Sequence, residues 1–105
     1  MALEIYWTAF AKKELKKIFD YYKINATLDV AFNLTSEIAK KTLILKSYPR
    51  AGKSEELLID RKQEFRYLVY KNYKIIYWIN IQNNRVEVID VFDSRQNPVK
   101  LKRNE

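Results

Sequence analysis

The chain of 105 residues contains no cysteine and no histidine. Without cysteine it can form neither disulfide bonds nor thiolate metal sites. Without histidine it lacks the commonest general base and the commonest transition-metal ligand. No cluster of carboxylates replaces these ligands in the sequence, so we expect no metal ion and no cofactor. Any catalysis would have to use lysine, arginine, tyrosine, aspartate or glutamate.

Glycine and proline are also scarce, with one glycine and two prolines in the chain. A single glycine excludes the Walker loop and the dinucleotide-binding fingerprint. Flexible linkers are not indicated, and we expect one domain over residues 1–105. The opening stretch MALEIYWTAF lacks the pattern of a signal peptide, and no segment approaches the length of a membrane span. We therefore expect a cytoplasmic protein without a membrane partner.

The charge is strongly basic, because 20 lysines and arginines stand against 13 acidic residues and give a net charge of +7. Such a charge favours association with an anionic partner, either a nucleic acid, an acidic protein or a membrane surface. A basic protein that is merely soluble would show the same composition. Charge alone therefore narrows the class of partner without choosing one.

One strand and two helices are predicted in the first half of the chain. Residues 3–7, LEIYW, alternate briefly between apolar and polar side chains and favour a strand. Thr8 is a suitable N-cap for the next segment, in which apolar residues recur at helical spacing. Thr27 or Asp29 begins a second helix, which runs to about Lys46. The short connection predicts an antiparallel helical hairpin.

The second half of the chain changes to a period of two. Strands are favoured by three runs of aromatic and β-branched residues, EFRYLVY, YKIIYWINI and RVEVIDVFD. Tight hairpins are favoured by the polar segments between them, Lys71-Asn72 and Gln82-Asn83-Asn84. The element order is β-α-α-β-β-β. We predict an α+β fold, with a helical hairpin packed on one face of a mainly antiparallel four-stranded sheet.

Two-residue turns at Lys71-Asn72 and at Asn83-Asn84 would fix which residues of the last three strands face each other. Arg66 would then lie opposite Tyr77, and Tyr77 opposite Asp90, in one polar row across the sheet. This row has two interpretations. It is either an ion pair with a phenol beside it, or an anion site in which arginine and tyrosine contact a phosphate or a base.

The two faces of the predicted sheet differ in composition. We assign the core beneath the helices to the more apolar face, which carries Phe65, Tyr67, Val69, Ile76, Trp78, Ile89 and Val91. The opposite face adds to the polar row a set of apolar residues, Leu68, Tyr70, Tyr73, Ile75 and Phe92. An uncovered apolar face often marks a binding site. A C-terminal tail folded over it, or a dimer contact, would also cover it.

Arg95 is a further candidate, because it follows the last strand in a polar segment, and strand ends often carry function. Other basic residues come just before or after the predicted strands of the sheet, and together with Arg95 they would form one basic rim: Arg61, Lys62, Lys100, Lys102 and Arg103.

Four segments in this order resemble one known family. They are I-x-W-T-x-x-A-x-x-x-L-x-x-I-x-x-Y near the start, then YPRAG, FRYLVYKNYKIIYWI and VIDVFDSRQNPVK. Together they cover nearly the whole chain and resemble the ParE/RelE superfamily of toxins from bacterial type II toxin–antitoxin modules. The resemblance implies the fold predicted above. It also implies a basic toxin that an acidic antitoxin neutralises by covering its apolar surface, and that reaches operator DNA only through the antitoxin.

The superfamily includes two activities. RelE-like members cleave mRNA in the ribosomal A site, whereas ParE-like members inhibit DNA gyrase. The segments RYLVYKNYKIIYWI and VFDSRQNP are closer to the ParE-like pattern, although Asp93 stands where ParE-like chains commonly have histidine. The lack of histidine argues against a histidine-dependent cleavage. It leaves open a mechanism in which lysine, arginine and tyrosine stabilise the transition state.

Three functional hypotheses follow from the resemblance. We predict a ParE-like gyrase inhibitor whose antitoxin contacts the open apolar face, and whose target or another anion contacts Arg61, Arg66, Tyr77, Asp90 and Arg95. The first alternative is a metal-independent, ribosome-dependent mRNA endonuclease with the candidate catalytic residues Arg66, Tyr77, Arg95, Lys74 and Arg85. The second alternative is an inactive remnant that only binds its partner.

Overall fold

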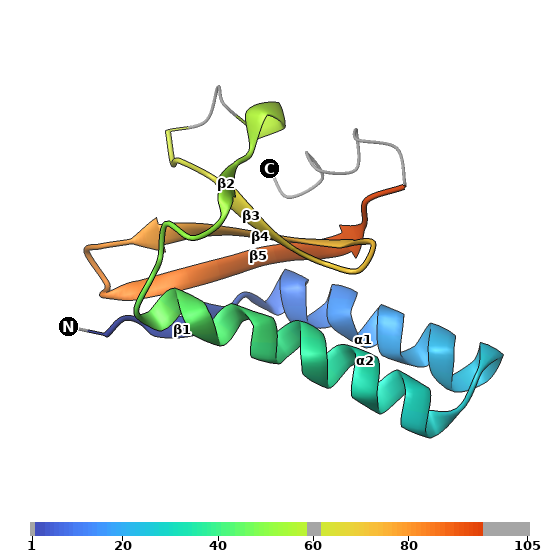
Figure 1. Cartoon of the computed structure of the whole chain (residues 1–105). Coiled ribbons are helices and arrows are strands. Elements are labelled where there is room, and N and C mark those ends of the chain that lie inside the picture. Colours follow the sequence, from blue (N-terminus) through green and yellow to red (C-terminus); the bar gives the residue numbers. More distant parts are fainter. Residues whose placement is uncertain (1, 59–61, 96–105) are drawn as a thin grey trace.

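The computed structural model describes residues 2–58 and 62–95, and it has two layers, a helical hairpin and a twisted sheet (Figure 1). The elements in chain order are β1 (Glu4–Trp7), α1 (Ala9–Asn25), α2 (Leu28–Lys41), the 3₁₀ helix η1 (Thr42–Lys46), β2 (Lys53–Ser54), the 3₁₀ turn η2 (Glu56–Leu58), β3 (Arg66–Tyr70), β4 (Tyr73–Asn80) and β5 (Arg85–Asp93). This α+β order confirms the predicted arrangement. In the described part of the chain, no helix is both long and apolar enough to cross a membrane.

Threonine side chains set the starts of both helices. The hydroxyl of Thr8 accepts a hydrogen bond from the backbone nitrogen of Ala11 at 3.1 Å, and Thr27 accepts one from Val30 at the same distance. The end of the second helix differs from the prediction. α2 stops at Lys41, and the next five residues continue as a 3₁₀ helix. Over a single turn an α-helix and a 3₁₀ helix space apolar residues similarly, so the sequence pattern does not distinguish the two helix types.

The sheet has five strands in the order β1-β5-β4-β3-β2, with β1 parallel to β5 and the remaining neighbours antiparallel. The prediction of four strands missed β2, which pairs only two residues, Lys53 with Tyr67 and Ser54 with Arg66. Two residues are too few to show a period of two. The parallel pairing of β1 places the start of the chain at the edge of the sheet, beside β5 (Figure 1).

The first hairpin has the predicted register. Arg66 lies opposite Tyr77 and Tyr70 opposite Tyr73, with Lys71 in the turn at a φ of 53°. The second hairpin does not. Its turn spans four residues, 81–84, and the side chain of Asn80 accepts a hydrogen bond from the backbone of Asn83 at 3.2 Å.

The longer turn sets a register in which Tyr77 lies opposite Val88. A β-bulge between Tyr77 and Ile76 then shifts the pairing by one residue, so that Asp90 lies opposite Ile76. The predicted polar row of Arg66, Tyr77 and Asp90 is therefore wrong. Asp90 is fully buried, on the other side of the sheet from Tyr77.

The assignment of the two sheet faces is also wrong. The side chains that pack against the helices are Leu68, Tyr73, Ile75, Tyr77, Val86, Val88 and Val91, with Tyr70 and Ile79 at the edge of this core. The opposite face carries a smaller cluster, in which Leu58 of η2 covers Ile76 and Phe92. Of the five residues expected to contact an antitoxin, Leu68, Tyr73 and Ile75 thus belong to the main core, Tyr70 packs against its edge, and Phe92 is buried in the second cluster.

Candidate functional site

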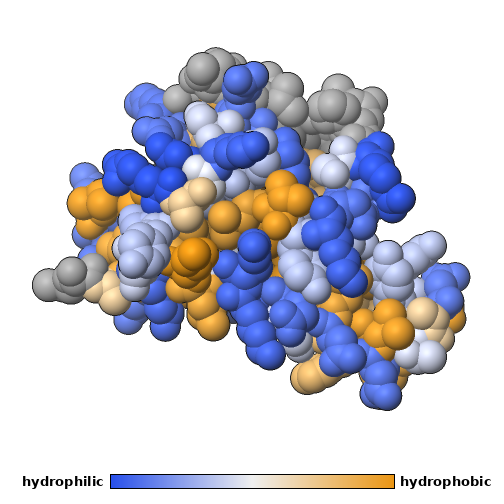
Figure 2. All heavy atoms as spheres, viewed as in Figure 1, coloured by the Kyte–Doolittle hydropathy of each residue, from blue (hydrophilic) through white to orange (hydrophobic). Residues whose placement is uncertain are grey.

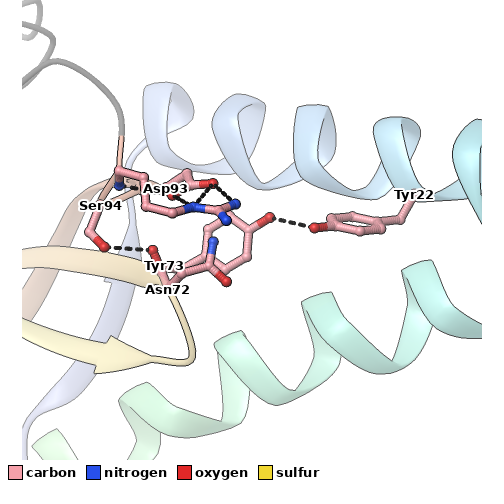
Figure 3. Close-up of polar contacts among 6 residues, drawn as sticks. Tyr22, Asn72, Tyr73, Asp93 and Ser94 are labelled. Carbon is pink, nitrogen blue, oxygen red and sulfur yellow. Dashed lines mark hydrogen bonds and ion pairs between the residues drawn. The ribbon is translucent and has the colours of Figure 1, made fainter.

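A hollow of about 460 Å³ opens between α1 and the end of β5. The strand exit, residues 93–95 at the end of β5, carries the candidate Arg95, which lies at the rim of the hollow. The apolar residues Ile18, Val91 and Phe92 form part of its wall, and the remaining lining is aromatic or charged: Glu14, Lys17, Tyr21, Tyr22, Tyr73 and Asp93. Figure 3 shows Tyr22 of α1 reaching toward Tyr73 and Asp93 of the sheet.

The strand exit is held by an ion pair two residues apart. Arg95 donates from Nε to Oδ1 of Asp93 at 3.0 Å and from Nη2 to Oδ2 at 2.7 Å, and its backbone nitrogen donates to Oδ1 at 2.9 Å (Figure 3). The hydroxyl of Ser94 donates to the backbone oxygen of Asn72 at 2.9 Å, which ties the exit to the β3–β4 turn. Hydrogen bonding by Arg95 holds the pKa of Asp93 well below its usual range, and Asp93 in turn raises the pKa of Arg95.

Two phenols connect the sheet to α1 beside this ion pair. The hydroxyl of Tyr73 donates to the hydroxyl of Tyr22 at 3.2 Å, and the ring of Tyr22 meets Tyr21 edge to face with centroids 5.1 Å apart. Burial, together with the hydrogen bond to Tyr22, raises the pKa of Tyr73 far above its ordinary value. Tyr73 therefore remains a neutral hydrogen-bond donor at any physiological pH.

A second ion pair lies on the helix side of the hollow, where Nζ of Lys17 is 3.0 Å from Oε2 of Glu14. The two pairs have the same construction. The carboxylates are mostly buried, with side-chain exposures of 9% for Glu14 and 17% for Asp93, whereas Lys17 and Arg95 are 64% and 74% exposed. Each acid thus anchors a cation that points outward at the rim. Glu14 could have been found in the sequence, because it lies three residues after Ala11 and four before Ile18 on the apolar face of α1.

The other sequence candidates lie elsewhere. Tyr77 is fully buried, and its hydroxyl donates to the backbone oxygen of Pro49 at 2.7 Å and accepts from the backbone nitrogen of Gly52 at 2.9 Å. Arg66 donates from Nη1 to the backbone oxygen of Gly52 at 2.9 Å and forms an ion pair with Glu64. Burial raises the pKa of Tyr77. Both side chains therefore hold the loop that follows η1, which is a structural role.

Lys74 and Arg85 are similarly engaged. Nζ of Lys74 lies 2.9 Å from Oε1 of the buried Glu55 and 4.1 Å from the ring centroid of Tyr67. Arg85 pairs with Glu87 at 2.9 Å and stacks over Tyr6. The predicted basic rim is not tested, because Arg61, Lys100, Lys102 and Arg103 lie outside the described residues. Within residues 2–58 and 62–95, no three acidic side chains gather as ligands for a metal ion.

Comparison with known proteins decides the family. The sequence matches the family model of the ParE toxin of type II toxin–antitoxin systems over residues 5–98. The chain belongs to the ParE toxin family. No curated protein is similar enough in sequence to count as a match.

Solved structures share the fold of this ParE-family chain at low sequence identity. A chromosomal ParDE system from P. aeruginosa has 14% identity and a TM-score of 0.71, over 88% of this chain and 96% of the other. The RelBE2 toxin–antitoxin complex from Mycobacterium tuberculosis has 14% identity and a TM-score of 0.63, over 89% and 92%. The isolated E. coli RelE toxin has 19% identity and a TM-score of 0.62, over 96% and 94%. The predicted superfamily and fold are confirmed.

The ion pair of Asp93 with Arg95 can be tested through the pKa of Asp93, the residue that stands where ParE-like chains commonly have histidine. We expect Arg95→Gln in this ParE-family chain to raise the pKa of Asp93 toward its ordinary value of 3.8, because the main hydrogen bonds that favour the carboxylate are lost. A carboxyl group whose folded pKa is depressed stabilises the fold above its unfolded pKa. That contribution is then lost as the pH falls below about 4 toward the folded pKa.

The measurement is a carboxyl ¹³C NMR titration of wild type and of Arg95→Gln. Lys46→Gln serves as the control, since Lys46 is exposed and adjoins Leu3 near the opposite end of β5. A wild-type Asp93 that titrates at its ordinary pKa would contradict the ion pair.

Proposed function

We propose that this ParE-family toxin acts in the cytoplasm by binding DNA gyrase, and that an acidic antitoxin neutralises it. The match to the ParE toxin over residues 5–98 is the observation that carries the proposal. Similar folds in a ParDE system and in a RelBE2 toxin–antitoxin complex support an antitoxin as partner. On this proposal the toxin meets operator DNA only through that antitoxin.

The pairing of the candidate cations favours binding over RNA cleavage. Arg66, Lys74, Arg85 and Arg95 each form an ion pair with a carboxylate in the described part of the chain. An ion-paired cation keeps N–H donors for a binding contact, but it supplies less net charge to stabilise a phosphorane than an uncompensated cation does.

The distance between two of these cations, Arg85 and Arg95, also favours binding over RNA cleavage. Arg85 begins β5 and Asp93, which holds Arg95, ends it, so the two ends are roughly 26 Å apart at about 3.3 Å per residue. Their side chains cannot converge on one phosphate. The wide separation of Arg85 and Arg95 therefore supports binding over cleavage.

The direct test is the supercoiling of relaxed plasmid by purified gyrase. We expect loss of supercoiling once the toxin reaches about the concentration of gyrase, and restoration when the antitoxin is added. Because a protein with a charge of +7 can also bind plasmid DNA, relaxation by topoisomerase I in the same buffer is the control and should be unaffected.

Toeprinting of translating ribosomes separates the proposal from the endonuclease alternative. An intact message is expected in the presence of the toxin. A-site cuts that disappear in Arg66→Ala, without any inhibition of gyrase, would reject the proposal. Overexpression without growth arrest would instead indicate an inactive remnant.

A further inference from the structure

We propose that the hollow between α1 and the end of β5 anchors the antitoxin by holding one of its carboxylate side chains between Lys17 and Arg95. The inference rests on the proposed function for the existence of an acidic antitoxin. It adds the place on the toxin and the chemistry of the contact. Most of the residues expected from the sequence to make this contact are buried, with Leu68, Tyr73 and Ile75 in the main core and Phe92 in the second cluster, which favours a more accessible surface.

Arg95 is prepared to bind a second anion. A guanidinium has five N–H donors in one plane, and Asp93 takes the donor at Nε and one at Nη2. No described residue accepts from Nη1, so the edge formed by Nη1 and the second Nη2 hydrogen can take a carboxylate with two parallel hydrogen bonds. The ion pair with Asp93 fixes the guanidinium before binding, which lowers the entropy lost when a partner arrives.

Lys17 and Tyr22 supply further donors toward the same hollow. The ammonium group of Lys17 is anchored by Glu14 and remains largely exposed. The hydroxyl of Tyr22 accepts the hydrogen of Tyr73, so its own hydrogen is left for another acceptor, and none of the described residues provides one. Two cations and a phenol, supplied by α1 and the end of β5, thus line a hollow that also has apolar walls.

The surroundings match an acidic protein segment better than a nucleic acid. The hollow contains two carboxylates, Glu14 and Asp93, and each neutralises one of its two cations. The donors that remain can hold a single further carboxylate, whereas the repeated phosphates of a nucleic-acid backbone need an excess of positive charge that the hollow lacks. A protein segment can present one carboxylate with apolar neighbours. On α1 the hollow is continued by Tyr21 and Ile24, which are 59% and 80% exposed, and Figure 2 shows apolar atoms among charged ones near the α1–α2 turn.

Charge complementarity extends beyond the hollow. α1 carries five lysines and two acidic residues, and all five lysines are exposed. An acidic segment that lies along α1 would gain a favourable electrostatic approach in addition to the anchored carboxylate. We therefore place the antitoxin across the C-terminal half of α1, with its anchor at the strand exit.

The test measures the affinity of the full-length toxin for the acidic polypeptide encoded next to its gene, by isothermal titration calorimetry. We expect Arg95→Glu and Lys17→Glu each to weaken binding by about 100-fold, because each loses a charge-assisted contact and gains a repulsive one. Arg95→Lys keeps the charge but loses the two parallel donors, and about 10-fold weaker binding is expected. Lys46→Glu makes the same charge reversal away from the hollow and should stay within about 3-fold of wild type.

The outcomes separate this inference from the proposed function. Thermal unfolding of each variant confirms that it is folded before its affinity is compared. Equal affinities of wild type, Arg95→Glu and Lys17→Glu would overturn the anchor, as would a wild type that does not bind the polypeptide. Loss of binding to a DNA duplex in Arg95→Glu, with unchanged antitoxin affinity, would assign the hollow to nucleic acid and overturn it too. If gyrase is not inhibited but the expected affinity losses are found, the target is wrong and the anchor is supported.

Discussion

Gly52→Ala is expected to lower the free energy of unfolding by about 3 kcal/mol, at the upper end of the cost of overpacking a core. A Cβ atom at this position would lie 2.6 Å from the backbone oxygen of Tyr67, 2.6 Å from the hydroxyl of Tyr77 and 2.8 Å from its Cε1. The first of these is backbone of β3, and Tyr77 is a fully buried ring, so neither can move at low cost. The position needs glycine for space, since its φ is not positive.

Chemical denaturation of purified wild type and variant measures this change, and for a domain of this size about 3 kcal/mol corresponds to a melting temperature lower by roughly 12–24 °C. Ala51→Ser is the matched control. It also adds one heavy atom, but Ala51 is exposed, and a change within about 0.5 kcal/mol is expected. A Gly52→Ala variant as stable as the control would show that the loop moves away from Tyr77 freely.

The parts of the fold that the sequence predicts are those decided by local interactions. The threonine caps and the apolar spacing of α1 depend on contacts within a few residues, and both helices begin where these signals are. The Lys71-Asn72 turn likewise leaves one register for β3 and β4. The family resemblance needed only the order and length of these segments, and it too is confirmed.

The parts that the sequence does not predict depend on contacts between distant residues. Both sheet faces are apolar, because η2 covers one as the helices cover the other, so hydrophobicity could not identify the helical face. The bulge between β4 and β5 has no periodic signal, and with the longer turn it moved Asp90 away from Tyr77. The longer turn and the bulge together therefore separate the residues of the predicted polar row.

The surroundings of individual side chains likewise depend on residues that are distant in the sequence. The sequence predicts Arg95 as a polar residue at a strand end, but it does not predict the neighbours Tyr22 and Lys17, which come from a helix more than 70 residues earlier. Glu55 pairs with Lys74 across 19 positions of the sequence, and no local pattern indicates this contact. A sequence can indicate which residues are chemically suitable, whereas their convergence depends on tertiary packing.

Tyr77→Phe is expected to lower the free energy of unfolding by about 2–3 kcal/mol, because removal of the hydroxyl leaves two backbone groups of the loop without a partner. The hydroxyl now bonds to the oxygen of Pro49 and the nitrogen of Gly52, and the second bond is buried. The ring itself stays the same, so neither a cavity nor a clash contributes. Equilibrium unfolding in urea measures the change at constant pH.

Tyr73→Phe is the control, since it removes one hydroxyl that donates a partly buried hydrogen bond to another side chain. A cost of about 1 kcal/mol is expected there, because the hydroxyl of Tyr22 can bond to water instead. The comparison also tests the sequence-based hypothesis that Tyr77 is catalytic. A catalytic tyrosine would lose activity in the phenylalanine variant without loss of stability, whereas a residue that holds the loop loses stability first. A Tyr77→Phe variant as stable as wild type would therefore contradict the structural role and return Tyr77 to the list of chemical candidates.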